Sequence, residues 1–221
     1  ESHRGTNFHI WRTDIAEATI NQLTADPNFD DHSPKWSPDG HTIAFTRNGV
    51  KETLVKANVW LMAQDGANPQ LLLEGATAFR WMPDGRGIVY FSARDRQFYL
   101  YDVSAKSARQ LTDEKGIPGM FTVSPDGQWV VYQSTMKGTV DVRAVQTSGG
   151  PSRVIVETPR EDYHPFVSPS GKWLYFQPDH KNLYRVPGPA QGWRKAEPEK
   201  VTNFPESGLF LEDPQISRDG R

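Results

Sequence analysis

Trp36-Ser37-Pro38-Asp39-Gly40, followed by His41-Thr42-Ile43-Ala44-Phe45, joins a turn signal to an alternating apolar segment, and this combination decides the fold. Proline fixes φ at the first corner of a turn, aspartate bonds to nearby backbone, and glycine accepts positive φ. The pentapeptide therefore predicts a tight hairpin turn. Variants of it recur along the chain, ending in glycines that lie 45, 42, 44 and 49 residues apart: Gly40, Gly85, Gly127, Gly171 and Gly220.

The segment after each of the first four turns has the pattern of a strand. The third residue after the glycine is apolar in every copy, and the fifth is aromatic. Positions two apart lie on the same face of a strand, so one face of each segment is predicted to be buried. The third residues are Ile43, Ile88, Val130 and Leu174, and the fifth are Phe45, Tyr90, Tyr132 and Phe176.

A second hairpin fills the rest of each period, so every repeat holds four short strands. Four-stranded units with a period of roughly 40–50 residues are typical of a β-propeller. A solenoid of β-arcs is the competing architecture, but its repeats are shorter and parallel, and hairpin turns argue against it. The sequence predicts an all-β chain, a single propeller domain over 1–221, with four full blades and partial blades at both ends: 1–29, 30–74, 75–117, 118–160, 161–208 and 209–221.

Composition excludes several classes of protein. The 221 residues hold 25 Lys+Arg against 27 Asp+Glu, a formal charge of -2, so there is no general electrostatic case for nucleic acid. Cysteine is absent, which removes disulfides and thiolate chemistry but leaves the compartment open. No apolar stretch reaches the length of a membrane-spanning helix, and we expect no direct membrane insertion.

The residues from Gln22-Leu23-Thr24 through Asp31-His32-Ser33-Pro34-Lys35-Trp36 to Phe45 resemble the TolB-type, WD-like propeller repeat of bacterial proteins. The resemblance covers nearly the whole chain. It implies an interaction scaffold found in periplasmic proteins, in prolyl-oligopeptidase-like peptidases and in sensory regions of bacterial regulators. It favours an extracytoplasmic location without fixing a role, because a fold does not determine a function.

The usual active-site strings are missing, including Gly-x-Ser-x-Gly, His-Glu-x-x-His and phosphate-binding loops. We therefore expect no catalytic residue, no cofactor and no metal. The resemblance then implies a non-catalytic protein- or peptide-binding or sensory module of a bacterial protein, and the partial blades at both ends predict that it belongs to a larger propeller of six or more blades. The alternative is the propeller of a prolyl-oligopeptidase-like peptidase or of a metal-dependent lyase.

The candidate binding residues lie in the links that enter the innermost strands, which open on the same side as the links between second and third strands. They form a predicted acidic inner ring: Asp30, Asp31, His32, Glu161, Asp162, His164, Glu212 and Asp213. The second set of links is mixed and leans basic: Arg47 to Lys56, which includes Lys51 and Glu52, then Arg94-Asp95-Arg96, Lys137 and Asp179-His180-Lys181. Such a mouth suits a cationic group or a polypeptide segment. The alternative is that the acidic residues cap local turns.

Two further features stay open at this stage. His32 and His164 are read as equivalent positions, which invites either a divalent metal or a histidine that bonds a neighbouring loop. An insertion of five residues around Pro187 to Trp193 carries a tryptophan that either binds a ligand or covers a blade edge. The tryptophans on repeat strands, Trp36, Trp81, Trp129 and Trp173, are expected in packing.

Overall fold

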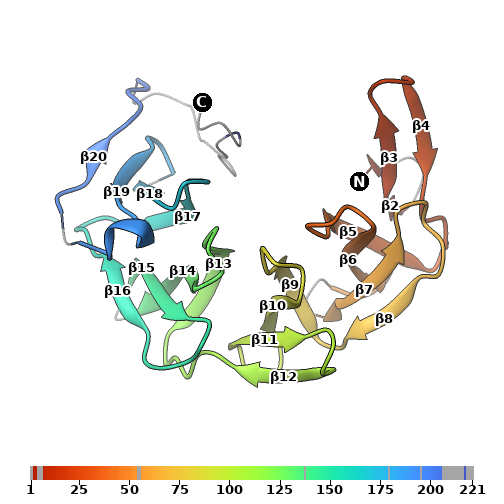
Figure 1. The fold of residues 1–221 in the computed structure, drawn as a ribbon, viewed down its shortest axis with the longest axis horizontal. Helices are drawn as coiled ribbons and strands as arrows, with labels where there is room; N and C mark the ends of the chain where they lie inside the picture. Colours follow the sequence, from red (N-terminus) through yellow and green to blue (C-terminus); the bar gives the residue numbers. More distant parts are fainter. Residues whose placement is uncertain are drawn as a thin grey trace. The chain divides into compact units, whose positions relative to one another are not determined.

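The computed structural model describes residues 2–3, 7–53, 56–136, 138–178, 180–194, 196–205 and 217. The predicted all-β class is confirmed in these residues, which form antiparallel sheets of two or four strands (Figure 1). The chain divides into two compact units, Glu1–Ala108 and Arg109–Arg221. The predicted partial blade 209–221 lies outside the described residues, apart from position 217.

The first unit begins with short pairings and continues with four-stranded sheets. Strands β1 and β2 pair with each other, and β3 pairs with β4 as a separate hairpin. The next sheet has the order β5-β6-β7-β8, and the following one, β12-β11-β10-β9, runs two residues past the division between the units. The bounds are β1 Ser2–His3, β2 Phe8–His9, β3 Trp11–Asp14, β4 Thr19–Gln22, β5 Phe29–Trp36, β6 Thr42–Gly49, β7 Asn58–Ala63, β8 Gln70–Leu73, β9 Ala76–Trp81, β10 Gly87–Ser92, β11 Phe98–Asp102 and β12 Ser107–Gln110.

The second unit repeats the same plan in two four-stranded sheets, β13-β14-β15-β16 and β17-β18-β19-β20. A 3-10 turn, η2, lies in the link between β19 and β20. The bounds are β13 Ile117–Val123, β14 Trp129–Met136, β15 Thr139–Gln146, β16 Arg153–Val156, β17 Asp162–Val167, β18 Trp173–Pro178, β19 Tyr184–Pro187, η2 Pro189–Gln191 and β20 Glu199–Lys200.

The turn signal works through its serine and aspartate side chains. Ser37 Oγ donates to Asp39 Oδ1 at 2.6 Å and accepts from the Thr42 N–H at 3.0 Å, so the hydroxyl links the two arms of the hairpin. Asp39 also accepts from the His41 N–H at 3.0 Å, and Gly40 has φ +75°. These hydrogen bonds stabilise the ionised carboxylate and hold the pKa of Asp39 below its ordinary value.

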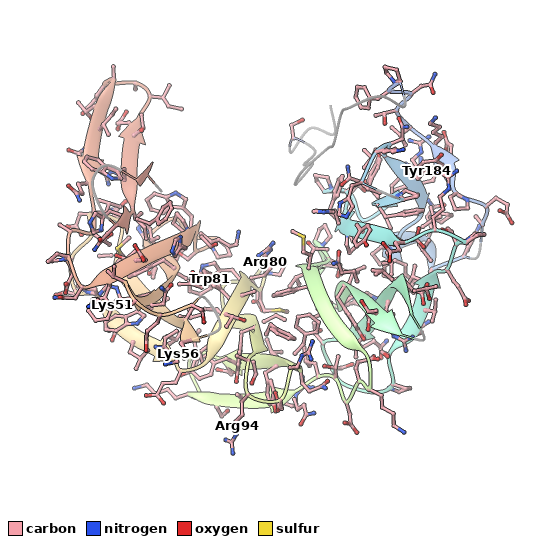
Figure 2. All side chains as sticks on the ribbon, turned by 180° about the vertical axis from the view of Figure 1, so that it is seen from behind. Lys51, Lys56, Arg80, Trp81, Arg94 and Tyr184 are labelled. Carbon is pink, nitrogen blue, oxygen red and sulfur yellow. The ribbon has the colours of Figure 1, made fainter. Side chains whose placement is uncertain are left out.

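The predicted core positions are buried. Ile43, Ile88, Val130 and Leu174 are at most 3% exposed, and the aromatic residues two positions later are fully buried except Tyr90, which is half-buried. Within each unit, the two four-stranded sheets share a cluster of buried apolar residues. In the first unit Trp81, labelled in Figure 2, donates its indole N–H to the Lys35 carbonyl at 3.2 Å and so ties β9 to β5. Trp36 differs from the packing prediction, because 48% of it is exposed.

The inner strands β5, β13 and β17 each carry a β-bulge near the start of the strand. The pairing register of β5 with β6 shifts between His32 and Lys35, and that of β17 with β18 shifts between Tyr163 and Phe166. Ser33 and His164 both have positive φ, 51° and 52°, a conformation that non-glycine residues seldom adopt. Each precedes a proline. The register therefore aligns Ser33, rather than His32, with His164, which corrects the equivalence read from the sequence by one residue.

Candidate functional site

Asp31 and Asp162 stand at matching places in β5 and β17, and both are fully buried. Asp31 pairs across the sheet with Arg47, whose Nε and Nη2 donate to the two carboxylate oxygens at 2.6 and 2.9 Å. The Arg47 guanidinium also lies about 5 Å from three ring centroids, those of Phe29, Phe45 and Trp60. A two-bond contact of this kind compensates a buried charge, so the pair holds the end of the sheet together.

The Asp162 carboxylate has hydrogen-bond partners of a different kind. The residue opposite it in the register is Pro178, which carries no positive charge. The Asp162 carboxylate accepts from the Thr158 N–H at 3.1 Å and from the Thr158 hydroxyl at 3.0 Å. These bonds fix the link that leads from β16 into β17. The geometry of Asp162 is that of a local cap, which is the alternative that sequence reasoning kept open.

The remaining predicted residues of the first unit lie around the start of β5. Asp30 Oδ1 accepts from the Phe8 N–H at 2.8 Å, and the His32 ring lies 4.8 Å from the Phe8 ring. The exposed lysines Lys51 and Lys56, labelled in Figure 2, belong to the link that follows β6, and Arg94 belongs to the link between β10 and β11. Of the predicted basic positions, Lys137 lies outside the described residues, as do Glu212 and Asp213 of the acidic set.

The second unit gathers aromatic and imidazole rings at the loop end of β17 and β18. His164 Nε2 lies 3.1 Å from His180 Nδ1, and the two rings meet edge to face at 5.0 Å. Tyr163 stacks on His180 with centroids 3.8 Å apart, and its hydroxyl donates to Glu161. The half-buried rings Tyr163, His164 and His180 are called the ring cluster below.

Backbone geometry holds the ring cluster in place. The His164 N–H donates to Gln133 Oε1 at 3.1 Å, so β14 of the neighbouring sheet positions the bulge. His180, like His164, has positive φ, 55°. A non-glycine residue in this region costs stability and persists where surrounding contacts impose it. Sequence reasoning identified Glu161 and His164 and noted the His180 link as opening on the same side, but it missed that Tyr163 and His180 complete the cluster.

A buried polar network forms a different feature of the second unit. Glu114 accepts hydrogen bonds from the Tyr132 hydroxyl at 2.6 Å and from the Ser152 hydroxyl, and it lies 3.4 Å from Arg143 Nε. Burial and the bond to Glu114 raise the pKa of Tyr132 well above its usual range. A cavity of about 710 Å³ opens beside it, lined by 110–115, Arg143 and 150–152. No motif in the sequence pointed to this network.

Two negative findings apply to the described residues. They contain no group of three or more His, Cys, Asp or Glu side chains placed to hold a metal ion. Nor does any helix in this part of the chain have the length and apolar character needed to cross a membrane.

Comparison with known proteins finds bacterial relatives that match part of the chain. No protein-family model matches the sequence. An uncharacterized protein of Agrobacterium fabrum, Atu1656, is 28% identical over 144 residues, 63% of this chain and 48% of that protein. The uncharacterized peptidase YuxL of Bacillus subtilis is 25% identical over 149 residues, 49% of this chain and 22% of that protein. The chain thus matches about half or less of the length of these relatives.

Solved structures agree on the fold. TolB from Acinetobacter baumannii superposes with a TM-score of 0.71 at 18% identity, covering 95% of this chain and 51% of that chain. An oligogalacturonate lyase in complex with manganese gives 0.67 at 22% identity, covering 84% and 55%. A chain of the nidogen/laminin complex gives 0.65 at 11% identity, covering 85% and 73%. The chain has a TolB-like β-propeller fold, as its repeat predicted.

Proposed function

We propose that this chain is a non-catalytic propeller module that binds a polypeptide partner at the loop end of β17 and β18. The observation that carries the proposal is the ring cluster itself. Tyr163 and His164 lie at the start of β17, His180 lies in the link that follows β18, and all three are half-buried. Binding residues on loops that a rigid scaffold positions are the usual arrangement in such proteins.

The chemistry of the ring cluster suits a cationic or aromatic side chain. Aromatic rings offer large, rigid contact area and attract cations over their faces. Glu161, exposed and bonded to the Tyr163 hydroxyl, adds a negative charge beside the rings. Because the bulge and the hydrogen bonds around it already fix the backbone of the ring cluster, the cluster would lose little conformational freedom on binding.

This proposal uses only some of the acidic and histidine residues that the sequence predicted as a ring. Asp31 and Asp162 are buried and engaged in hydrogen bonds, so they support the links, while Glu161 is exposed and His164 is half-buried beside it. The nidogen/laminin complex, a protein complex that includes a chain of the same fold, supports a role in protein binding.

A photo-crosslinking residue placed at either end of β18 tests the proposal in the full-length protein. Lys181 adjoins the ring cluster and Lys172 lies at the turn end of the same strand, and both are exposed. We expect a discrete crosslinked polypeptide from position 181 and none from position 172. The same product from both positions, or none from position 181, would contradict the proposal.

A second candidate function rests on the two imidazole nitrogens of His164 and His180. Nitrogens 3.1 Å apart can ligate one ion, since each binds zinc-like metals at about 2.0–2.1 Å. The chain resembles in structure an oligogalacturonate lyase in complex with manganese, so the activity to test is metal-dependent lyase chemistry. Two imidazoles are fewer than the three or four ligands of a typical site, so binding stoichiometry decides between the candidates.

Calorimetric titration with manganese and zinc tests the second candidate. Stoichiometric binding that His180→Ala removes, together with formation of unsaturated product from oligogalacturonate, would favour it over the binding module. Substoichiometric metal would reject it. The peptidase alternative rests on the partial match to YuxL, and a Gly-x-Ser-x-Gly segment in the flanking sequence of the full-length protein is the observation that would support it.

A further inference from the structure

β16 is the outermost strand of its sheet, and a groove runs along it within the second unit. The sheet order β13-β14-β15-β16 leaves one edge of β16 without a strand partner among the described residues. A cavity of about 280 Å³ lies beside this edge, between 153–158 on one wall and Val186, Trp193 and 196–198 on the other. Unpaired strand edges present rows of N–H and C=O groups that can pair with another chain.

The facing wall is the loop that the sequence identified as an insertion. The Gly188 N–H and the Gln191 side chain both donate to the Lys172 carbonyl at 2.8 Å, which fastens the loop to the turn between β17 and β18. A Cβ at Gly188 would lie 2.6 Å from the Gly171 carbonyl oxygen, so only glycine permits this approach. These contacts therefore hold the loop in a fixed position as one wall of the groove.

Trp193 supplies a polar group that the groove leaves unsatisfied. Its ring packs against Trp129, edge to face at 5.6 Å, and it contacts the core shared by the two sheets. The indole Nε1 is buried and has no hydrogen-bond partner within the described part of the chain. An unsatisfied buried donor destabilises the folded chain, and a backbone carbonyl that reached it from the groove would satisfy it.

Apolar and charged groups define what the groove would accept. Val154, 43% exposed, and the half-buried Ile155 provide apolar contact in the middle of β16. Arg153 stands at the start of the strand, Glu157 follows its end, and Glu197 lies on the facing wall. A peptide that runs antiparallel to β16 would place its first residues near Glu157 and its last residues near Arg153.

We propose that the β16 groove binds an extended peptide by strand addition, antiparallel to β16, with a basic residue at the peptide's amino end, apolar residues in the centre and an acidic residue at its carboxyl end. Main-chain hydrogen bonds to the free edge give affinity, and alternate side chains give specificity. A peptide carbonyl accepts the hydrogen bond from the Trp193 indole. This surface is separate from the ring cluster and goes beyond the proposed function.

Fluorescence polarisation with a labelled hexapeptide, Lys-Thr-Val-Thr-Val-Glu, tests the proposal on the full chain. We expect saturable binding below about 1 mM, the weak end of specific association. The charge-reversed peptide, Glu-Thr-Val-Thr-Val-Lys, should bind at least about tenfold more weakly, and methylation of alternate backbone nitrogens should abolish binding. Equal binding of the charge-reversed peptide, or none of the first, would overturn the proposal.

The chain offers a matched control for the groove. Val154 pairs with Arg143, and Leu71 of β8 pairs with Trp60 in the same way and is 44% exposed, but only Val154 lines this groove. Val154→Glu should abolish binding while Leu71→Glu leaves it unchanged. Trp193→Phe keeps an aromatic side chain and removes the indole N–H donor, and it should weaken binding about fivefold, the equivalent of one hydrogen bond.

Three outcomes separate this proposal from its rivals. Equal effects of Val154→Glu and Leu71→Glu would show that the peptide adds to strand edges at random and would overturn it. Unchanged affinity in Trp193→Phe would do the same for the indole contact. Concentration-dependent dimers that Val154→Glu disrupts, in place of peptide binding, would assign the edge to a second copy of the chain. Since His180→Ala should leave peptide binding here unchanged, failure of the ring-cluster proposal is distinguishable.

Discussion

The starts of β5 and β17 share one backbone and carry two different chemistries. Both have a buried aspartate, a bulge, a residue with positive φ and then a proline. Opposite the aspartate, β6 supplies Arg47, whereas β18 supplies Pro178. The loop end of β5 is thus closed by a buried ion pair, whereas the loop end of β17 carries half-buried aromatic and imidazole rings. A repeat can keep its scaffold while a single cross-strand position decides whether its loop end is structural or available for binding.

The largest difference should appear when each aspartate is removed. Asp31→Ala leaves the Arg47 guanidinium buried without its counter-charge, so we expect a loss of about 3–5 kcal/mol in the free energy of unfolding. Asp162→Ala removes hydrogen bonds to Thr158 and should cost about 1–2 kcal/mol. Chemical denaturation, with hydrogen exchange of β5 and β17 amides to locate the effect, measures both.

A compensating substitution sharpens that comparison. Asp31→Ala combined with Arg47→Met replaces the ion pair by apolar contact and should recover part of the lost stability. If the two single substitutions cost the same, or if the double variant is no more stable than Asp31→Ala, then the ion pair does not distinguish the two regions.

The hairpin turns of the same two sheets should differ in their dependence on pH. Ser37 donates to Asp39, whereas Ser168 faces Ser170, a neutral residue in the same position of the turn. Ser37→Ala should therefore destabilise the protein more near neutral pH than in acid, and Ser168→Ala should have the same effect at both. Thermal melting of the two variants across pH gives the measurement.

The direction of this pH dependence follows from the lowered pKa of Asp39. A carboxyl whose folded-state pKa lies below its usual 3.8 contributes stability that is present above that value. This contribution is lost as the pH falls through the folded-state pKa, where wild type and Ser37→Ala should converge. A gap that widens in acid would contradict the assignment of the Ser37–Asp39 hydrogen bond.

The smallest effect is expected from the exposed ion pair of β19 and β20. Arg185 donates to both carboxylate oxygens of Glu199 at 2.9 and 2.7 Å, with the same bidentate geometry as Arg47 and Asp31 but at the surface. The hydrogen bonds from Arg185 lower the pKa of Glu199. Because solvent screens exposed pairs, Glu199→Gln should change the unfolding midpoint little, and added salt should remove the remaining difference.

The sequence was sufficient for features that depend on local spacing. Turn, apolar and aromatic positions after Gly40 predicted β6 and its buried face, because proline, aspartate and glycine constrain the backbone within a few residues. Trp11 and Leu23 are 12 residues apart, whereas Tyr184 and Val201, at the matching positions of a later repeat, are 17 apart, so spacing also located the five-residue insertion.

Contacts between strands set the limit of what could be predicted. His32 corresponds to Tyr163 and not to His164, because each lies eight residues before its turn glycine, Gly40 or Gly171, and the bulge occupies the same place in both strands. The partner of Asp31 follows from that register and could not be read from spacing. The hydrogen bond between Glu114 and Tyr132 joins the link before β13 to β14, 18 residues apart, and no periodicity in the sequence predicts it.

The central claim is that partner recognition depends on the ring cluster, and one measurement tests it most directly. With a crosslinking residue at position 181 of the full-length protein, the yield of crosslinked partner is compared between wild type and His180→Ala. We predict at least about a tenfold lower yield in the variant, equivalent to about 1.4 kcal/mol of binding free energy, with an unchanged melting temperature. An unchanged yield in a fully folded variant would contradict the account.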